Sequence, residues 1–104
     1  MRFDSDKAFN QLMEKGIVAT MRNFPYQPGK RARIIRHGKY ICTAYILARY
    51  ENTEENRRKL LKISGFTSLE EWENEATKLF GSLPKYIIVV SLKPGGFCLD
   101  PKSR

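Results

Sequence analysis

The apolar segment from Tyr86 to Leu92 sets the tightest limit on how this chain can fold. It is almost continuous in Ile, Val and Leu, and it has the length of a strand. Such a run is typical of a strand covered on both faces, because a strand with one solvated face alternates apolar and polar residues. It is also the longest apolar stretch of the chain, whereas a membrane-spanning helix needs about 20 apolar residues. The sequence therefore predicts a buried central strand and no helix that spans a bilayer.

Three segments carry the signals of helices. Each begins at a Ser or Thr that can cap a helix N-terminus, continues with apolar residues at helical spacing, and ends at a glycine. The first covers residues 5–15, the second begins in residues 52–55, and the third opens with a capping-box pattern. The predicted caps are Ser5, Thr53 and Ser68, and the predicted ends are Gly16, Gly65 and Gly81.

The remaining ordered segments are predicted strands. They are rich in β-branched and aromatic residues and are separated by turn residues, including Pro28-Gly29, which suits a type II turn, and His37-Gly38-Lys39, which suits a hairpin connection. In the longest strand, alternation assigns Cys42, Ala44, Ile46 and Ala48 to one face and Ile41, Thr43, Tyr45 and Leu47 to the other. The strands are Ile17 to Arg22, Ala32 to Arg36 and Tyr40 to Tyr50, with a short extra strand at Met1 to Phe3.

The order of these elements predicts an α+β domain. Because the strands come as hairpins and do not alternate with helices, we expect a small, mixed but mostly antiparallel sheet flanked by helices. A sheet of so few residues is expected to curl into a partly closed barrel. The length of 104 residues suits one domain, which we assign to residues 1–93, followed by a flexible tail over 94–104.

Positive charge is concentrated in one third of the chain. The net charge is +8, and residues 15–50 contain eight basic residues and no acidic one. Such a concentration is typical of a surface that binds a polyanion. The alternative is a surface rich in Lys and Arg for solubility and ion pairing, but ion pairing would need acidic residues among the basic ones.

The candidate nucleic-acid-binding residues come from this basic region. Alternation places Arg31 and Arg33 on one side of their strand and Arg36 on the other. Tyrosines lie among the cations and could stack on unpaired bases, or could equally pack in the sheet and along its rim; these are Tyr26, Tyr40, Tyr45 and Tyr50. The predicted contact residues are Arg22, Tyr26, Lys30, Arg31, Arg33, Arg36 and Lys39.

Several other kinds of chemistry lack the residues that they need. The single histidine, His37, is expected in an exposed turn, and Cys42 and Cys98 are far apart, so we predict no metal site and no disulfide framework. Glycine-rich phosphate-binding patterns are missing, so no cofactor is predicted. Trp72 and Cys42 are expected in the core, and Cys98 is expected to be exposed. The start of the chain has no secretory signal pattern, and we expect a cytosolic protein.

Parts of the sequence resemble the ASCH domain of the PUA-like superfamily. The similarity extends over about residues 5–93, and its specific part is the order of the elements; the segments that carry it are Phe9 to Arg22, Tyr26 to Lys30, the hairpin, Gly65 to Trp72 and Tyr86 to Leu92. The resemblance implies a small β-barrel with helices beside it and a cleft at the first helix-to-strand junction. It also implies RNA binding, since members are regarded as RNA-binding modules. Some small bacterial members are amidohydrolases acting on N4-acetylcytidine, and another has been described as a ribonuclease.

The family pattern is matched in part. It runs glycine, any residue, lysine, two residues, threonine or glutamate, one residue, arginine, and Thr20 and Arg22 match its last two positions. The lysine position falls on Ile17, and the acid of the amidohydrolases falls near Ser64, several residues before Glu71. Whether the chain is an enzyme therefore stays open; the candidate catalytic residues are Lys15, Thr20, Arg22 and Glu71.

Three functions are compatible with the sequence. The first is binding of RNA or single-stranded nucleic acid, with the cations of the front half converging on one basic cleft. The second is an ASCH-type hydrolase acting on N4-acetylcytidine or RNA. The third is a regulatory domain whose basic face binds an acidic protein.

Overall fold

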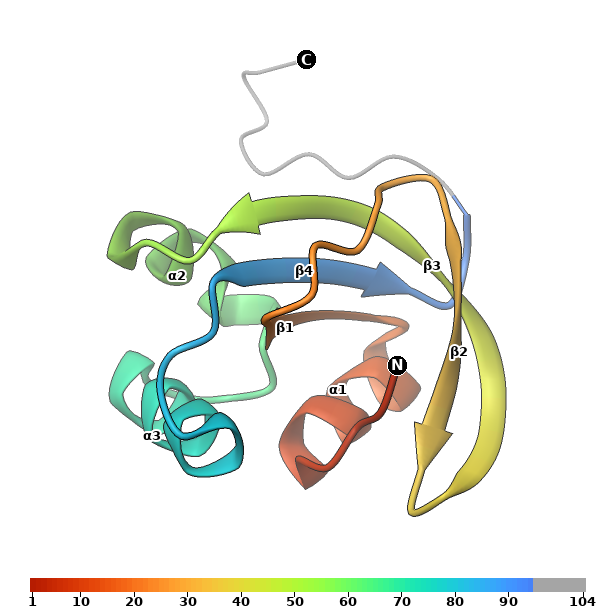
Figure 1. Cartoon of the computed structure of the whole chain (residues 1–104), viewed down its shortest axis with the longest axis horizontal. Helices are drawn as coiled ribbons and strands as arrows, with labels where there is room; N and C mark the ends of the chain where they lie inside the picture. The colour runs from red at the N-terminus through yellow and green to blue at the C-terminus, as the bar shows by residue number, and fades with distance from the viewer. Residues whose placement is uncertain (95–104) are drawn as a thin grey trace.

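The computed structural model describes residues 1–94, which form an α+β fold with three helices and a four-stranded antiparallel sheet (Figure 1). In chain order the elements are α1 (Asp6–Lys15), β1 (Ile17–Arg22), β2 (Arg31–Arg36), β3 (Lys39–Glu51), α2 (Glu54–Leu60), the short 3-10 helix η1 (Leu61–Ile63), α3 (Leu69–Phe80) and β4 (Tyr86–Ser91). The three predicted helices and the four longer predicted strands are present, with differences of extent described below. Residues 95–104, which include Cys98 and most of the predicted tail, lie outside the described part. None of the helices in residues 1–94 has the length and hydropathy of a membrane span.

The apolar strand β4 lies inside the sheet, as predicted. The strand order is β1-β4-β3-β2, and all three neighbouring pairs are antiparallel. Val89 pairs with Ala19 of β1 on one side and with Ala48 of β3 on the other. The four residues from Ile87 to Val90 are fully buried, so both faces of β4 are covered.

The predicted barrel closure is wrong. β1 and β2 are the two edges of the sheet and do not pair with each other within residues 1–94. The free edge of β2 is instead taken by the N-terminal segment: Arg2 forms a parallel bridge with Ile35, whose backbone bonds to Met1 and Phe3 at 2.9 Å each. The short strand predicted at Met1 to Phe3 is thus reduced to a single bridge. Since this segment satisfies the backbone groups of β2, β1 has no partner there to close a barrel.

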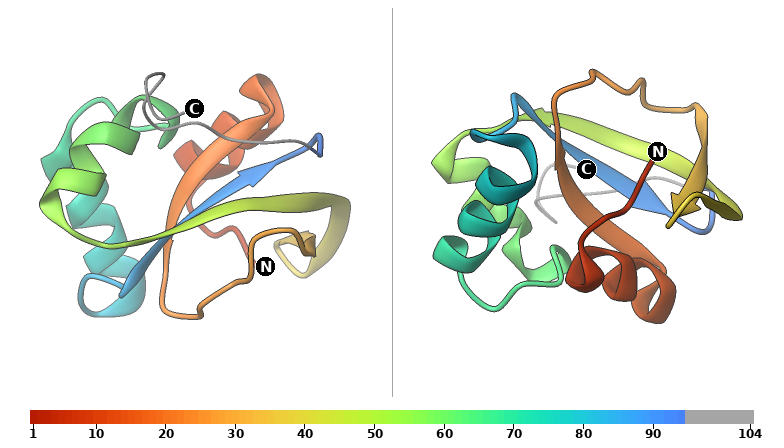
Figure 2. Two further views of the ribbon diagram at one scale, coloured as in Figure 1. Left: turned by 90° about the horizontal axis from the view of Figure 1, so that it is seen from above. Right: turned by 60° about the horizontal axis from the view of Figure 1, so that its bottom comes forward.

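Two apolar cores lie on opposite faces of the sheet. The first packs α1 against all four strands, with Leu12 and Phe3 fully buried. The second packs Leu60 of α2, η1 and α3 against β1, β3 and β4, and contains Trp72, which is 2% exposed, as predicted for a core residue. No residue of β2 belongs to this second core. Figures 1 and 2 accordingly show α2 and α3 at one end of the molecule and the β2–β3 hairpin at the other.

Two β-bulges interrupt β3 and change which face its side chains occupy. In the first, Ile34 and Ile35 of β2 pair with Cys42 and Tyr40, which leaves Ile41 as the extra residue. In the second, Val90 and Val89 of β4 pair with Ile46 and Ala48, which leaves Leu47 as the extra residue.

The simple alternation predicted for Ile41 to Ala48 is therefore wrong at its C-terminal end, and it does not extend to Tyr40. Ala48 packs in the second core, whereas Ala44 and Ile46 pack in the first. Tyr40 lies on the face of Thr43, because its hydroxyl and the Thr43 hydroxyl are 2.8 Å apart. A bulge adds one residue to a strand, and so reverses the alternation beyond it.

Local hydrogen bonds fix the helix starts and the turns. Each predicted cap accepts a bond from a backbone N–H of the first turn: Ser5 from Ala8, Thr53 from Asn56 and Ser68 from Glu71. His37 is exposed and has a φ of 52°, and Gly38 has a φ of 77°, so the connection from β2 to β3 is a two-residue type I′ turn. The second helix is shorter than predicted, because α2 ends at Leu60 and the chain continues as η1.

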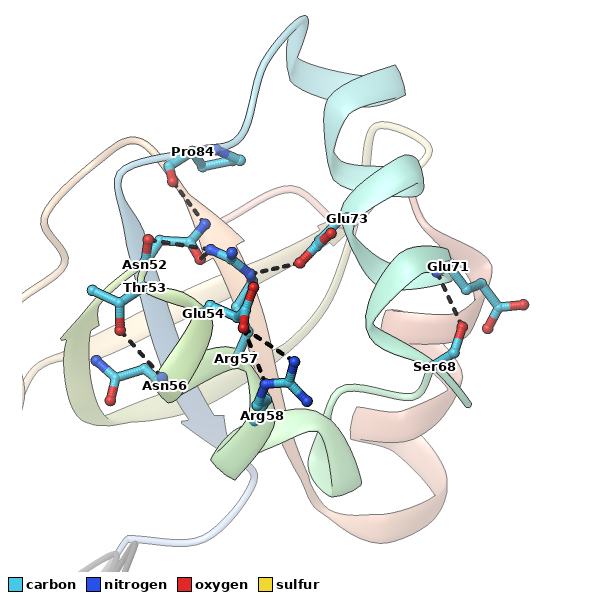
Figure 3. A network of polar contacts seen from close by, with 10 residues as sticks. All are labelled: Asn52, Thr53, Glu54, Asn56, Arg57, Arg58, Ser68, Glu71, Glu73 and Pro84. Carbon is cyan, nitrogen blue, oxygen red and sulfur yellow. Dashed lines mark hydrogen bonds and ion pairs between the residues drawn. The ribbon is translucent and has the colours of Figure 1, made fainter.

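A polar network centred on Arg57 joins α2 to α3 and to the end of β3 (Figure 3). The guanidinium of Arg57 donates to the carboxylate of Glu73 at 2.9 Å and to the side-chain oxygen of Asn52 at 2.8 Å. Asn52 in turn donates to the carbonyl of Pro84 at 2.7 Å. The Arg57 side chain is 11% exposed, whereas Arg58 beside it is 66% exposed and bonds only to Glu54 of its own helix.

We expect Arg57→Ala to lower the free energy of unfolding by about 2 kcal/mol, because it leaves Glu73 and Asn52 without their shared donor. The matched variant Arg58→Ala should cost about 0.5 kcal/mol or less, since exposed ion pairs contribute little. Urea denaturation of both variants measures the difference. Equal losses in the two variants would show that the network does not hold α2 against α3.

Candidate nucleic-acid interface

The structure does not bring the seven predicted contact residues to one groove. Four of them, Lys30, Arg31, Arg33 and Lys39, are exposed on or beside the β2–β3 hairpin. The other three, Arg22, Tyr26 and Arg36, contact the first core or the segment before α1. The expected convergence of these cations on one basic cleft is therefore not seen.

Arg22 is held within the fold. Its guanidinium stacks on Phe3 at 4.7 Å, donates to the backbone carbonyl of Arg2 at 2.5 Å and reaches the hydroxyl of Thr20 at 3.3 Å. Burial lowers the pKa of Arg22 to about 10, so the group remains protonated at neutral pH. Through these contacts, Arg22 of β1 holds the N-terminal segment around Arg2 and Phe3, which pairs with β2. Arg22 therefore links the two edge strands of the sheet through that segment.

Arg36 and Tyr26 also serve the fold. The guanidinium of Arg36 lies over the ring of Phe9 at 4.8 Å, donates to the carbonyl of Phe3 and forms an ion pair with Asp6. Tyr26 packs against the first core and makes an edge-to-face contact with Phe24. A guanidinium that is already paired has less to gain from a phosphate than an unpaired one.

The outer face of the hairpin carries the cations that remain available. We define the hairpin face as Arg31, Arg33, Tyr40, Thr43 and Tyr45, whose side chains share one side of β2 and β3. Arg31 lies directly opposite Tyr45, and Arg33 lies opposite Thr43. Arg33 also stacks on the ring of Tyr40 at 4.8 Å. Lys30 precedes this face and Lys39 follows the turn, both exposed.

The cations of the hairpin are not neutralised by acidic residues. Within residues 1–94, Lys30, Arg31, Arg33 and Lys39 form no ion pair, whereas six ion pairs join other residues of that range. Unpaired cations on a shared surface create a positive potential that attracts polyanions. The hairpin face thus combines positive charge with exposed aromatic surface.

A large groove lies elsewhere and is acidic. It has a volume of about 670 Å³ and lies between the start of α1 and α3, where Phe66 and Lys7 line it. Its acidic residues outnumber its two lysines, so the basic cleft predicted from the sequence does not correspond to this groove. The acidic lining residues are Asp4, Asp6, Glu70, Glu71 and Glu75. A smaller cavity of about 90 Å³ beside it contains Thr20 and Arg22.

The candidate catalytic residues are only partly brought together. Thr20 and Arg22 share the smaller cavity, and Glu71 lies in the large groove, where Lys7 donates to its carboxylate at 2.6 Å. This bond lowers the pKa of Glu71. Lys15 lies in the last turn of α1, whereas the groove is at the first turn, and a helix of ten residues is about 15 Å long. Lys15 and Glu71 therefore do not form one site.

The described residues contain no metal-binding cluster. Within residues 1–94, no three side chains of His, Cys, Asp and Glu come together in a way that could hold an ion. Cys42 is half-buried against the first core, and burial raises the pKa of its thiol.

Comparison with protein-family models, with curated proteins and with solved structures finds no match for this chain.

The sequence pattern identified Arg31 and Arg33 as contact residues on one side of their strand. It did not show that the ring of Tyr40 lies on the same face of the hairpin. Alternation alone assigns Tyr40 to the face of Cys42, which packs inward. The bulge at Ile41 moves it to the opposite face. The sequence carries no signal for this bulge, because an apolar residue such as Ile41 is equally typical of a regularly paired strand.

Gly65 holds the segment before α3 against α1, beside the acidic groove. It has a φ of 91°, and an added Cβ would lie 2.4 Å from the backbone oxygen of Lys7. Gly16 has a similar φ of 81° with no atom within 4 Å of such a Cβ. The two glycines thus share the backbone requirement and differ in the available space.

We expect Gly16→Ala to cost about 1 kcal/mol of unfolding free energy, the usual penalty of the left-handed conformation. Gly65→Ala should cost at least twice as much, because the backbone of α1 must also move. Chemical denaturation of both variants provides the comparison. A smaller loss for Gly65→Ala would contradict the close packing of this segment on α1.

Proposed function

We propose that this protein binds RNA and that the hairpin face is the contact surface. The observation that carries the proposal is that Arg31 and Arg33 stand side by side, form no ion pair within residues 1–94, and lie next to the exposed ring of Tyr40. Arginine side chains bind phosphates through several N–H donors, and aromatic rings stack on bases. Lys30 and Lys39 extend the positive charge along both ends of β2.

The resemblance to ASCH domains supports the same function. Members of that family are regarded as RNA-binding modules, and we propose that this chain is a PUA-like domain of that kind. Its order of one helix, three strands, two helices and a last strand agrees with the proposed relationship. The contact surface that we propose is the hairpin face and not the groove between the start of α1 and α3, since acidic residues line that groove and would repel phosphate.

The other two functions receive less support from the geometry. A hydrolase that uses Lys15 with Glu71 would need both side chains at one site. Lys15 lies in the last turn of α1, whereas Glu71 of α3 lies beside the first turn of α1. An acidic protein could also bind the hairpin cations. Co-purification with and without nuclease treatment separates this third function from RNA binding, because only a protein partner survives the nuclease.

RNA binding through these cations predicts a definite salt dependence. If Lys30, Arg31, Arg33 and Lys39 each neutralise one phosphate of a single strand, log affinity should fall with log salt concentration at a slope near −3. Replacing Arg31 and Arg33 together by Ala should bring the slope closer to zero by about 1.4 and weaken all sequences about equally. Fluorescence anisotropy at several salt concentrations measures both quantities.

The control removes the same charge from the other end of the molecule. Lys62 and Lys78 are exposed, belong to η1 and α3, and form no ion pair within residues 1–94. The double variant Lys62→Ala with Lys78→Ala should keep the wild-type slope. The proposal is wrong if wild-type protein does not bind RNA, or if both double variants change the slope by the same amount.

A further inference from the structure

We propose that the hairpin face selects unpaired RNA over duplex RNA, by stacking a base on Tyr40 while Arg31 and Arg33 hold the phosphates of the same strand. This inference rests on the proposed RNA binding and specifies the form of RNA that the surface recognises. It depends on the exposed ring of Tyr40, on the β-bulge that positions it and on the arginines along the same face.

The ring of Tyr40 is both exposed and fixed in orientation. Tyr40 is 51% exposed, one of the most exposed large apolar or aromatic side chains in residues 1–94. The Arg33 guanidinium lies over the ring, and the hydroxyl bonds to that of Thr43 at 2.8 Å. A ring held in this way loses little conformational entropy when a base stacks on it. An exposed aromatic ring also offers a flat apolar surface on which a nucleobase can stack.

The β-bulge gives this ring its position. With Ile41 as the extra residue, Tyr40 turns to the outer side of the hairpin, next to Arg33. Without the bulge, the ring would point to the same side as Cys42, which packs on the first core. Bulges commonly re-aim a side chain at a functional surface.

The arginines that would hold the phosphates lie along the same face as the ring. Arg33 lies opposite Thr43 and over the ring of Tyr40, and Arg31 lies opposite Tyr45, two residues further along β3. Tyr40 itself is paired with Ile35, four residues of β2 from Arg31, so its backbone lies about 13 Å from that of Tyr45. A strand with one base stacked on Tyr40 therefore continues along Arg33 toward Arg31.

Duplex RNA cannot use the same contacts. Its bases are paired and stacked inside the helix, so their faces cannot reach Tyr40, and only the phosphates remain for the cations. A single strand can offer a base to the ring while its phosphates contact Arg31 and Arg33. The gain from stacking is independent of salt, whereas the phosphate contacts are not.

The test compares one RNA sequence as a single strand and as a duplex, against wild-type protein and two variants of Tyr40. Tyr40→Leu keeps apolar bulk but removes the ring, and we expect it to bind the single strand about five- to tenfold more weakly, with the wild-type salt slope. Tyr40→Phe keeps the ring and loses only the bond to Thr43, so its affinity should stay within about twofold of wild type. Neither variant should change binding to the duplex.

Thermal unfolding of both variants serves as the control, and we expect both to unfold at the wild-type temperature. Equal affinity of wild-type protein for single strand and duplex overturns the selection of unpaired RNA while leaving RNA binding in place. An unchanged affinity of Tyr40→Leu for the single strand overturns the role of the ring. If wild-type protein binds neither form, the proposed RNA binding itself fails, and the salt titration above would fail with it.

Discussion

The burial of β4 on both faces is the constraint on which the rest of the structure depends. Its apolar side chains must be covered twice, and a short chain achieves this with α1 on one face and α2, η1 and α3 on the other. The second group of helices reaches β1, β4 and the end of β3, but not β2. The outer face of the β2–β3 hairpin is left open to solvent as a result, and Arg31 and Arg33 lie on it.

The arginines of the basic region fall into two groups, one that stabilises the fold and one that is exposed on the hairpin. Arg22 and Arg36 each lie over an aromatic ring and donate to a backbone carbonyl of the segment before α1, so they hold that segment against the sheet. Arg31 and Arg33 have no acidic partner within residues 1–94 and point away from both cores. The two pairs of arginines therefore differ in how well they can bind a phosphate, although their formal charges are equal. The guanidinium groups of Arg22 and Arg36 have already replaced their bound water with protein contacts.

Charge is also divided between two surfaces of the molecule. The groove between α1 and α3 is lined mainly by carboxylates, whereas the hairpin carries cations. A polyanion that approaches such a molecule is repelled by the acidic groove and attracted by the hairpin. The separation of the two charges therefore favours approach to the hairpin and also stabilises the complex formed there. The exposed ring of Tyr40 lies on the attractive side, which places a stacking surface where phosphates would already be held.

Most of the secondary structure could be predicted from the sequence, because its causes are local. Capping residues such as Ser5 and Ser68, the glycines that end the helices, and the apolar run of β4 act within a few residues of their own positions. Charge is likewise visible in the sequence, since no acidic residue interrupts positions 15–50. Strand order, the open sheet and the separation of Arg22 and Arg36 from Arg31 and Arg33 depend on contacts between segments distant in the chain. The position of Tyr40 was decided in the same way, because the bulge at Ile41 arises from pairing β3 with its neighbours, and a shift of one residue exchanges the two faces of a strand.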